Sequence, residues 1–319
     1  MSLPSACPEC LRRAWLLARL GPYIERTLSG ERSGPLELLR RRNDDLAAAV
    51  APKVAEQICS EVAGLSEDRL AAQLRDAECW AVCRHDPRFP VGLLEAAERA
   101  PWALIGRGDP LLLERLRPER TVTVVGARRA SIYGREVARE LGRDLADAGL
   151  LVTSGLAFGV DACVHCGALE VGTTVAVLGC GADIAYPASH RSLWRRICEE
   201  GLVVSELPPG TGAWRWTFPA RNRIMAALSG MTVVVEAARR SGSLLTAGIA
   251  SELGRELGAV PGPVNSRASV GPNDLLAGGA CLVRDAQDVL DAILEGAPAS
   301  RPAGAVAPTK TIGKEEGDG

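Results

Sequence analysis

Lysine is almost missing from this chain. Only Lys53, Lys310 and Lys314 stand among the 37 basic residues, and 39 acidic residues leave a formal net charge of −2. This near-neutral balance excludes a basic coat over the whole surface, so a site for a polyanion must come from local clustering of arginine. Because Ala, Gly and Leu are abundant too, we attribute the excess of arginine over lysine to the base composition of the gene.

Long apolar runs are also absent. No stretch reaches the roughly 18–20 apolar residues of a membrane span. The N-terminus lacks the order of a signal peptide, because its basic residues follow the cysteines and Arg19 interrupts its apolar run. We therefore expect a cytoplasmic protein without a membrane partner, whose ten cysteines are mostly reduced thiols that pack like small apolar side chains.

A zinc-finger pattern is missing as well. The closely spaced cysteine pairs are Cys7 with Cys10, Cys79 with Cys83, and Cys163 with Cys166. A structural zinc site needs four convergent ligands. The first two pairs lie far apart with no standard spacing, and the third falls within a predicted helix. We expect no metal ion and no cofactor, and we expect neither His85 nor His190 to ligate a metal.

The sequence pattern divides the chain into three parts. Residues 1–78 show apolar spacings of three and four and predict a small all-helical domain, with helical pieces at 10–21, 35–41, 45–64 and 66–77. Residues 79–296 predict the main domain, in which 79–120 form a lead-in with an edge strand at "WALIGRG" (102–108). Residues 297–319, rich in Pro, Gly and Ala, predict a disordered tail.

From Thr121 onward, apolar runs rich in β-branched residues alternate with helical patterns. The predicted strands cover 121–126, 150–155, 173–179, 202–206, 231–237, 257–262 and 280–285. The predicted helical patterns cover 131–148, 158–170, 189–200, 217–229 and 243–257; a short segment at 273–279 precedes the last strand, and the pattern 286–295 follows it. This alternation predicts an α/β fold with a doubly wound, mostly parallel sheet.

The segments that follow the predicted strands share one edge of such a sheet, where ligands bind. The first of them, "GARRAS", lacks the G-x-G-x-x-G pattern of a NAD site. The edge instead collects glycines, serines and arginines, which suit phosphates. The pattern leaves open a polyphosphate or nucleic-acid site, a mononucleotide site, or arginines that only pair with Glu206 and Glu236. Aromatic residues nearby could stack on bases: Tyr133, Trp214, Trp216 and Phe218. The alternative for Trp214 and Trp216 is that they cover the core.

Eight motifs in this region occur in a specific order: "VGARRASIYG", "SGLAFGVDACVHCGAL", "VAVLGCGADIAYP", "VVSELPPG", "FPARNRIMAALS", "VVVEAARRSGSLLTAGIASELGRE", "AVPG" and "GPNDLLAGGA". Together they resemble the DprA/Smf family of bacterial DNA-processing proteins over roughly residues 80–290. The resemblance implies a Rossmann-like core that binds single-stranded DNA without sequence preference and loads the RecA recombinase in natural transformation. It also implies a homodimer without catalytic activity, and it likens the N-terminal helices to a sterile-alpha-motif-like domain.

The candidate DNA- and phosphate-binding residues come from the resemblance and from the sheet edge. The family's motifs fall on Gly126, Arg128, Arg215, Arg221, Asn222, Arg223, Ser241, Gly242, Ser243 and Thr246. The segments after the first two predicted strands of the alternation add Arg129, Ser131, Ser154 and Gly155. The chain departs from the family at Ala127, where a hydroxyl residue is usual, and we expect no room for a winged-helix domain after residue 296.

Two enzymatic interpretations are alternatives to DNA binding. A nucleotide-metabolism enzyme that releases bases from nucleoside monophosphates would need a P-G-G-x-G-T-x-x-E turn, where this chain has "RRSGSLLTAG". A hydrolase triad could use Ser154, Asp161 and His165, but no G-x-S-x-G elbow is present. We expect instead that Asp161 caps its own helix and holds His165 in one tautomer, and that the protein is not an enzyme.

Overall fold

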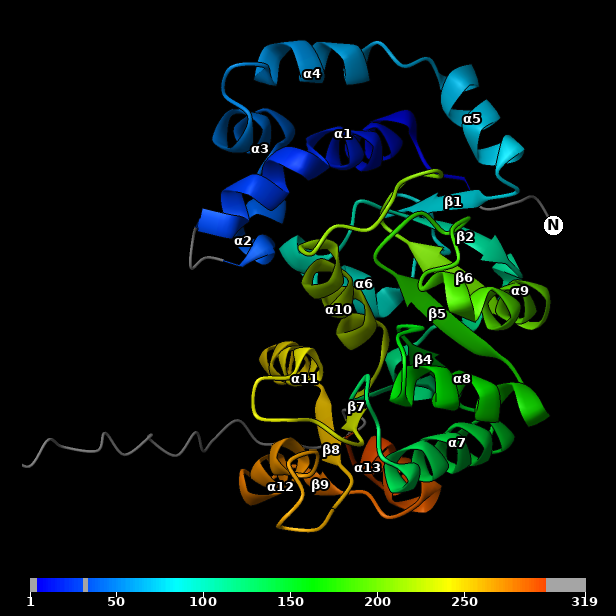
Figure 1. The fold of residues 1–319 in the computed structure, drawn as a ribbon. Coiled ribbons are helices and arrows are strands. Elements are labelled where there is room, and N and C mark those ends of the chain that lie inside the picture. Colours follow the sequence, from blue (N-terminus) through cyan, green and yellow to red (C-terminus); the bar gives the residue numbers. More distant parts are fainter. Residues whose placement is uncertain (1–4, 31–33, 297–319) are drawn as a thin grey trace, which may run out of the picture.

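The computed structural model describes residues 5–30 and 34–296, and a nine-stranded sheet runs through its centre (Figure 1). The strand order is β1-β2-β6-β5-β4-β3-β7-β8-β9. All neighbours from β6 to β9 are parallel, whereas β2 is antiparallel to both β1 and β6. The strands are β1 Trp80–Cys83, β2 Ala103–Gly108, β3 Thr121–Val125, β4 Leu151–Ser154, β5 Thr174–Leu178, β6 Leu202–Ser205, β7 Met231–Val234, β8 Glu256–Ala259 and β9 Cys281–Leu282.

The predicted α/β class with a doubly wound, mostly parallel sheet is confirmed. All seven strands predicted after residue 120 are present, though each is shorter than its apolar run. The reason is that such runs continue into buried loop residues, as at Val235 and Val260. The predicted tail, residues 297–319, lies outside the described residues.

The topology creates one switch point in the sheet. From β3 the chain adds β4, β5 and β6 on one side, and then returns to add β7, β8 and β9 on the other side. The loops after β3 and β7 therefore leave neighbouring strands in opposite directions, which opens a crevice at their carboxyl ends.

Helices cover both faces of the sheet and explain why its central strands are buried along their whole length. Side chains of α7, α8 and α13 pack with Val122 and Val124 on one face. Side chains of α6, α10 and α11 pack with Val175 and Val177 on the other. The helices of this part are α6 Val91–Glu95, α7 Ile132–Asp147, α8 Val160–Val171, α9 Arg191–Glu200, α10 Thr217–Leu228, α11 Gly242–Glu252, α12 Val270–Ala277 and α13 Ala286–Gly296.

The N-terminal region is all-helical in its described part, as predicted. It contains α1 Pro8–Gly30, α2 Pro35–Leu39, α3 Asn43–Val50, α4 Ala55–Ala63 and α5 Glu67–Asp76. Two predicted bounds were wrong: α1 continues through Pro22, and the single helix expected over 45–64 is broken at Pro52. These helices share a core with the sheet edge, where α1 packs near Ile105 of β2 and Trp216.

The predicted edge strand at 102–108 exists as β2, but it is not at the edge. The four-residue strand β1, which the sequence pattern did not reveal, pairs outside it. Every residue of β1 is buried, because the N-terminal helices cover this strand (Figure 1). Among the described helices, none combines the length and apolar character that a bilayer crossing requires.

Candidate nucleic-acid interface

The turn after β3 presents two arginines to solvent. Arg128 and Arg129 are exposed, and Gly126 lies against Val160, which leaves no room for a side chain. Ser131 caps α7 by accepting a hydrogen bond from Gly134 N at 3.0 Å. The turn is therefore anchored at its apolar start and at the following helix, while its two arginines remain exposed to solvent.

The turn after β7 is built around the start of α11. Ser241 is the N-cap, and its Oγ lies 2.7 Å from Ser243 Oγ. Gly242 is exposed with open space where a side chain would stand. Asn222 of α10 donates its Nδ2–H to Gly242 O at 3.2 Å and thereby ties the turn to α10. A helix N-terminus that begins with an exposed glycine flanked by two serines is suited to a phosphate group.

These two turns and α10 enclose a cleft of about 480 Å³ at the switch point, which we call the central cleft. Eight of the fourteen sequence-predicted residues line it: Gly126, Arg128, Arg221, Asn222, Ser241, Gly242, Ser243 and Thr246. Segments 120 residues apart in the sequence thus meet as the topology rule predicts.

Buried charges form the floor of the central cleft. Arg221 is 6% exposed; its Nη1–H donates to Val177 O at 2.9 Å, and its Nε has no hydrogen-bond partner among the described residues. Burial lowers the pKa of Arg221. Asp161, also buried, accepts hydrogen bonds from Gly155 N at 3.1 Å and Ala157 N at 3.4 Å. Burial raises the pKa of Asp161, although the positive charge of Arg221 acts to lower it.

Ser154 and Gly155 support this floor from below. Ser154 is buried and donates its Oγ–H to Val124 O at 2.7 Å. A Cβ at Gly155 would lie 1.4 Å from Arg221 Nη1, so only glycine leaves space for the guanidinium. Both residues act on the cleft through their neighbours rather than through an exposed group.

The guanidinium of Arg223 does not line the central cleft but is held in a buried ion pair. It is 3% exposed and donates to both carboxylate oxygens of Glu206 at 2.7 Å. An ion pair with Glu206 was one of the alternatives that the sequence left open. Glu236, the other candidate, instead accepts hydrogen bonds from Ser131 N at 2.9 Å and Ser131 Oγ at 2.6 Å.

The tryptophans near Arg215 belong to the core, which was the alternative to base stacking. Trp216 is buried and donates its Nε1–H to Gly21 O at 3.1 Å, and the rings of Trp214 and Trp216 stack at 6.1 Å. Arg215 itself is exposed, but it does not line the central cleft.

A second hollow of about 600 Å³, which we call the arginine hollow, begins where the central cleft ends. Arg128 lines both, and Arg129 and Arg135 line the arginine hollow. The sequence pattern did not reveal the exposed ring of Phe158, which lies in the loop after β4 and lines this hollow. It also did not reveal the exposed Tyr186, in the loop after β5, whose ring centroid lies 5.5 Å from that of Phe218. The "LAFG" and "IAYP" segments follow predicted strands, so their place at the edge was the available signal.

The arrangement around His165 differs from the expectation. His165 is buried, and its Nδ1 lies 2.8 Å from Thr174 Oγ1, so Thr174 rather than Asp161 fixes the ring. Asp161 binds amides of the preceding loop and gives its own helix no side-chain cap. Burial lowers the pKa of His165 to about 3, which suits a neutral core residue.

Known proteins resemble this chain in sequence and in fold. Residues 80–294 match the family model of DNA recombination-mediator protein A. A putative DNA processing protein DprA from Mycobacterium tuberculosis is 46% identical over 191 residues, which are 60% of this chain and 48% of that protein. The aligned part of the chain therefore spans about half the length of this curated relative.

Two solved structures share the fold. The X-ray structure of DNA processing protein A from Streptococcus pneumoniae superposes with a TM-score of 0.70 at 29% identity, over 90% of this chain and 98% of that one. The DNA processing protein A from Helicobacter pylori, studied for its single-stranded DNA binding mode, gives a TM-score of 0.61 at 28% identity. The match covers 68% of this chain and 96% of that one. The chain belongs to the DNA recombination-mediator protein A (DprA/Smf) family.

Proposed function

We propose that this chain binds single-stranded DNA without sequence preference along the central cleft and the arginine hollow. The observation that carries the proposal is the position of Arg128, an exposed arginine that lines both hollows. A mononucleotide would need only one of them. A strand could run from the start of α11 past Arg128 to Arg129 and Arg135.

The central cleft offers what a backbone phosphate requires. Gly242 and Ser243 lie at the start of an eleven-residue helix and contribute its positive end. Arg221 adds a buried positive charge whose Nε lacks a partner within the described part of the chain. Buried donors without partners are costly in a folded protein, so a phosphate oxygen that approaches this donor would be bound favourably.

The surface is suited to a flexible strand rather than to a duplex groove. Arg128 lies over the ring of Phe218, with its Cζ 5.3 Å from the ring centroid, and Phe158 and Tyr186 expose their rings nearby. Rings and guanidinium groups stack on any base, which gives binding that tolerates sequence. Arg223, Ser131, Ser154 and Gly155 would position this surface, while Arg221 and the other predicted residues that line the two hollows contact DNA. The exposed Arg215 would contact the strand outside the hollows.

The wider role follows from the family. We propose that the chain acts as a homodimer in the cytoplasm, loads RecA onto the bound strand during natural transformation, and performs no catalysis. The buried positions of Ser154 and His165 support the absence of catalysis, since neither side chain is open to a substrate. Incubation with nucleoside monophosphates should release no free base, and the chain should speed the formation of RecA filaments on single strands.

Filter binding tests the DNA proposal. Single-stranded and duplex oligonucleotides of equal length, and homopolymers of different base, are titrated at several salt concentrations. We expect the single strand to bind more tightly, with similar affinities for the homopolymers and a linear fall of log K with log salt. Equal binding of the duplex, or no salt dependence, would contradict the proposal.

A further inference from the structure

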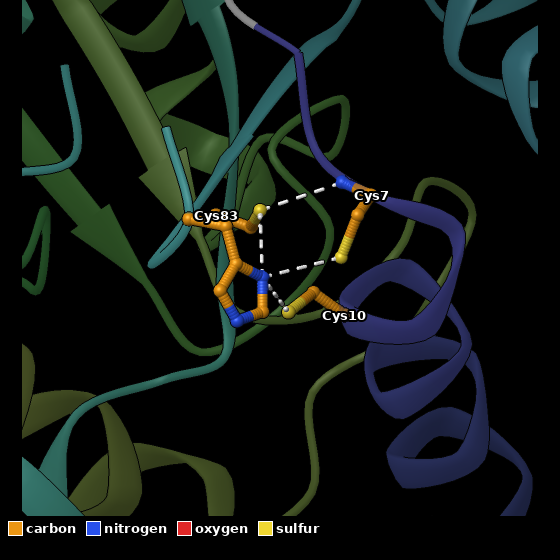
Figure 2. A group of neighbouring side chains, drawn as sticks. Cys7, Cys10 and Cys83 are labelled. Carbon is orange, nitrogen blue, oxygen red and sulfur yellow. Dashed lines mark hydrogen bonds between the residues drawn. The ribbon is translucent and has the colours of Figure 1, made fainter. Parts of the chain in front are cut away.

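Far from the cleft in sequence, three cysteines and a histidine meet where the N-terminal helices join the sheet. Cys7 and Cys10 lie at the start of α1, Cys83 ends β1, and His85 follows two residues later. The three sulfurs converge on one imidazole nitrogen (Figure 2): His85 Nδ1 lies 3.4 Å from Cys7 Sγ, 3.6 Å from Cys10 Sγ and 3.8 Å from Cys83 Sγ. All four ligand atoms lie within 4.8 Å of one another.

The three sulfur–nitrogen separations are close to those of a tetrahedral zinc site. Zinc binds thiolate sulfur at about 2.3 Å and imidazole nitrogen at about 2.0–2.1 Å, so tetrahedral angles place sulfur and nitrogen about 3.6 Å apart. Each of the three sulfur–nitrogen distances lies within a few tenths of an ångström of that value. One ion could therefore contact all four donors with little rearrangement.

The surroundings also fit a metal held by thiolates. Cys7 donates its backbone N–H to Cys83 Sγ at 3.4 Å, an interaction that stabilises charge on sulfur. Ala6, Trp102 and Ala103 pack around the cysteines and shield them from water on one side. Three soft thiolates and one imidazole in a closed set are typical of structural zinc rather than of calcium, magnesium or a catalytic ion.

We propose that Cys7, Cys10, Cys83 and His85 bind one zinc ion, which fastens the start of α1 to the end of β1. Binding replaces the protons of the three thiols, which pass to solvent. The ligands come from segments 76 residues apart, so the ion closes a long loop and holds the N-terminal helices on the sheet. This departs from the expectation that the chain has no metal site and that His85 is not a ligand.

Cys79 shows why the sequence pattern was misleading. It was grouped with Cys83 by spacing, but its Sγ donates to Ala77 O at 3.5 Å and lies outside the cluster. The second pair of ligands is instead Cys83 with His85, because alternate residues along and just beyond a strand point to the same side. Cys79 therefore serves as a matched control.

The test measures metal in the full-length chain purified without a metal-affinity tag. We expect one zinc ion per chain in the wild type and in Cys79→Ser, and loss of the ion in Cys83→Ser and in His85→Ala. Less than about a tenth of an equivalent in the wild type, together with no uptake when zinc is added to reduced protein, would overturn the proposal. Equal zinc content in all four proteins would overturn it too.

A second measurement, cobalt binding to the wild-type protein, tests the site even if a ligand variant folds poorly. Reduced wild-type protein, freed of metal by a chelator, is titrated with Co²⁺. We expect the intense visible absorption of tetrahedral cobalt–thiolate coordination, saturating at one equivalent, in the wild type and Cys79→Ser. A spectrum of octahedral cobalt without thiolate bands would contradict the site. Thiols are also counted in the protein as purified, without reductant. Eight free thiols instead of ten, with no bound metal, would indicate a disulfide and would likewise refute the zinc site.

Discussion

Replacement of Arg223 should show that this arginine supports the fold rather than contacting DNA. Its guanidinium is 3% exposed and holds both oxygens of Glu206, whose side chain is 12% exposed. Removing one partner of a buried ion pair costs about 3–5 kcal/mol, because the other charge stays buried and unpaired. The buried Arg13 also acts electrostatically on Glu206, so we expect Arg223→Ala to cost about 3 kcal/mol, at the lower end of that range.

The assay is urea unfolding at neutral pH, followed by circular dichroism. Removal of both charges in Arg223→Ala/Glu206→Ala should cost less than the sum of the single substitutions, because no charge is then stranded. In a thermal scan the single substitution should lower Tm by roughly 4–5 °C, because about 3 kcal/mol is divided by the unfolding entropy of a chain of this length. A loss below about 1 kcal/mol, the range of an exposed pair, would refute the inference that this pair is buried and structural.

Two further predictions concern the floor of the central cleft and its surroundings. Gly155→Ala should displace the guanidinium of Arg221 and lower the free energy of unfolding by about 1–3 kcal/mol, measured by urea unfolding. The control is Gly248→Ala, whose new Cβ would meet no atom within 4 Å and which should be neutral or stabilising. Equal losses in the two variants would contradict the close contact between Gly155 and Arg221. Burial holds the pKa of His165 at about 3 in the folded state, below its unfolded value of about 6.5. The unfolded state therefore gains a proton first, and the free energy of unfolding should fall as pH falls from about 6.5 toward 4, by at most about 1.4 kcal/mol per pH unit. His165→Asn should flatten this dependence, and an unchanged pH profile would show that the histidine titrates freely.

Much of the fold could be predicted from the sequence, because the spacing of apolar residues shows which residues of a strand or helix face the core. The strands from β3 to β7 are buried runs of apolar residues with a few Thr and Ser. Their alternation with helices predicts a parallel sheet without any contact information. The strand β1 was missed because four buried residues after a helix carry no distinctive period. Its burial depends on helices that precede it in the chain.

The candidate site was predictable as a set of turns but not as a set of side-chain directions. The topology rule placed Gly126, Ser241 and Arg221 at one edge, and the structure brings them together. Arg223, two residues after Arg221, points to Glu206 instead, because residues two apart on a helix face different ways. The zinc ligands could not be predicted, since the spatial pairing of Cys7 with Cys83 depends on the docking of α1 against β1.

The most direct measurement of the central claim compares two arginines at opposite ends of the same strand. Arg128 follows β3 at the cleft, and the exposed Arg120 precedes β3 at the other edge. For single-stranded DNA, Arg128→Ala should flatten the slope of log K against log salt by about 0.7, one phosphate contact, and Arg120→Ala should leave it unchanged. If Arg128→Ala binds with the wild-type slope and affinity, DNA does not pass the carboxyl edge of this sheet.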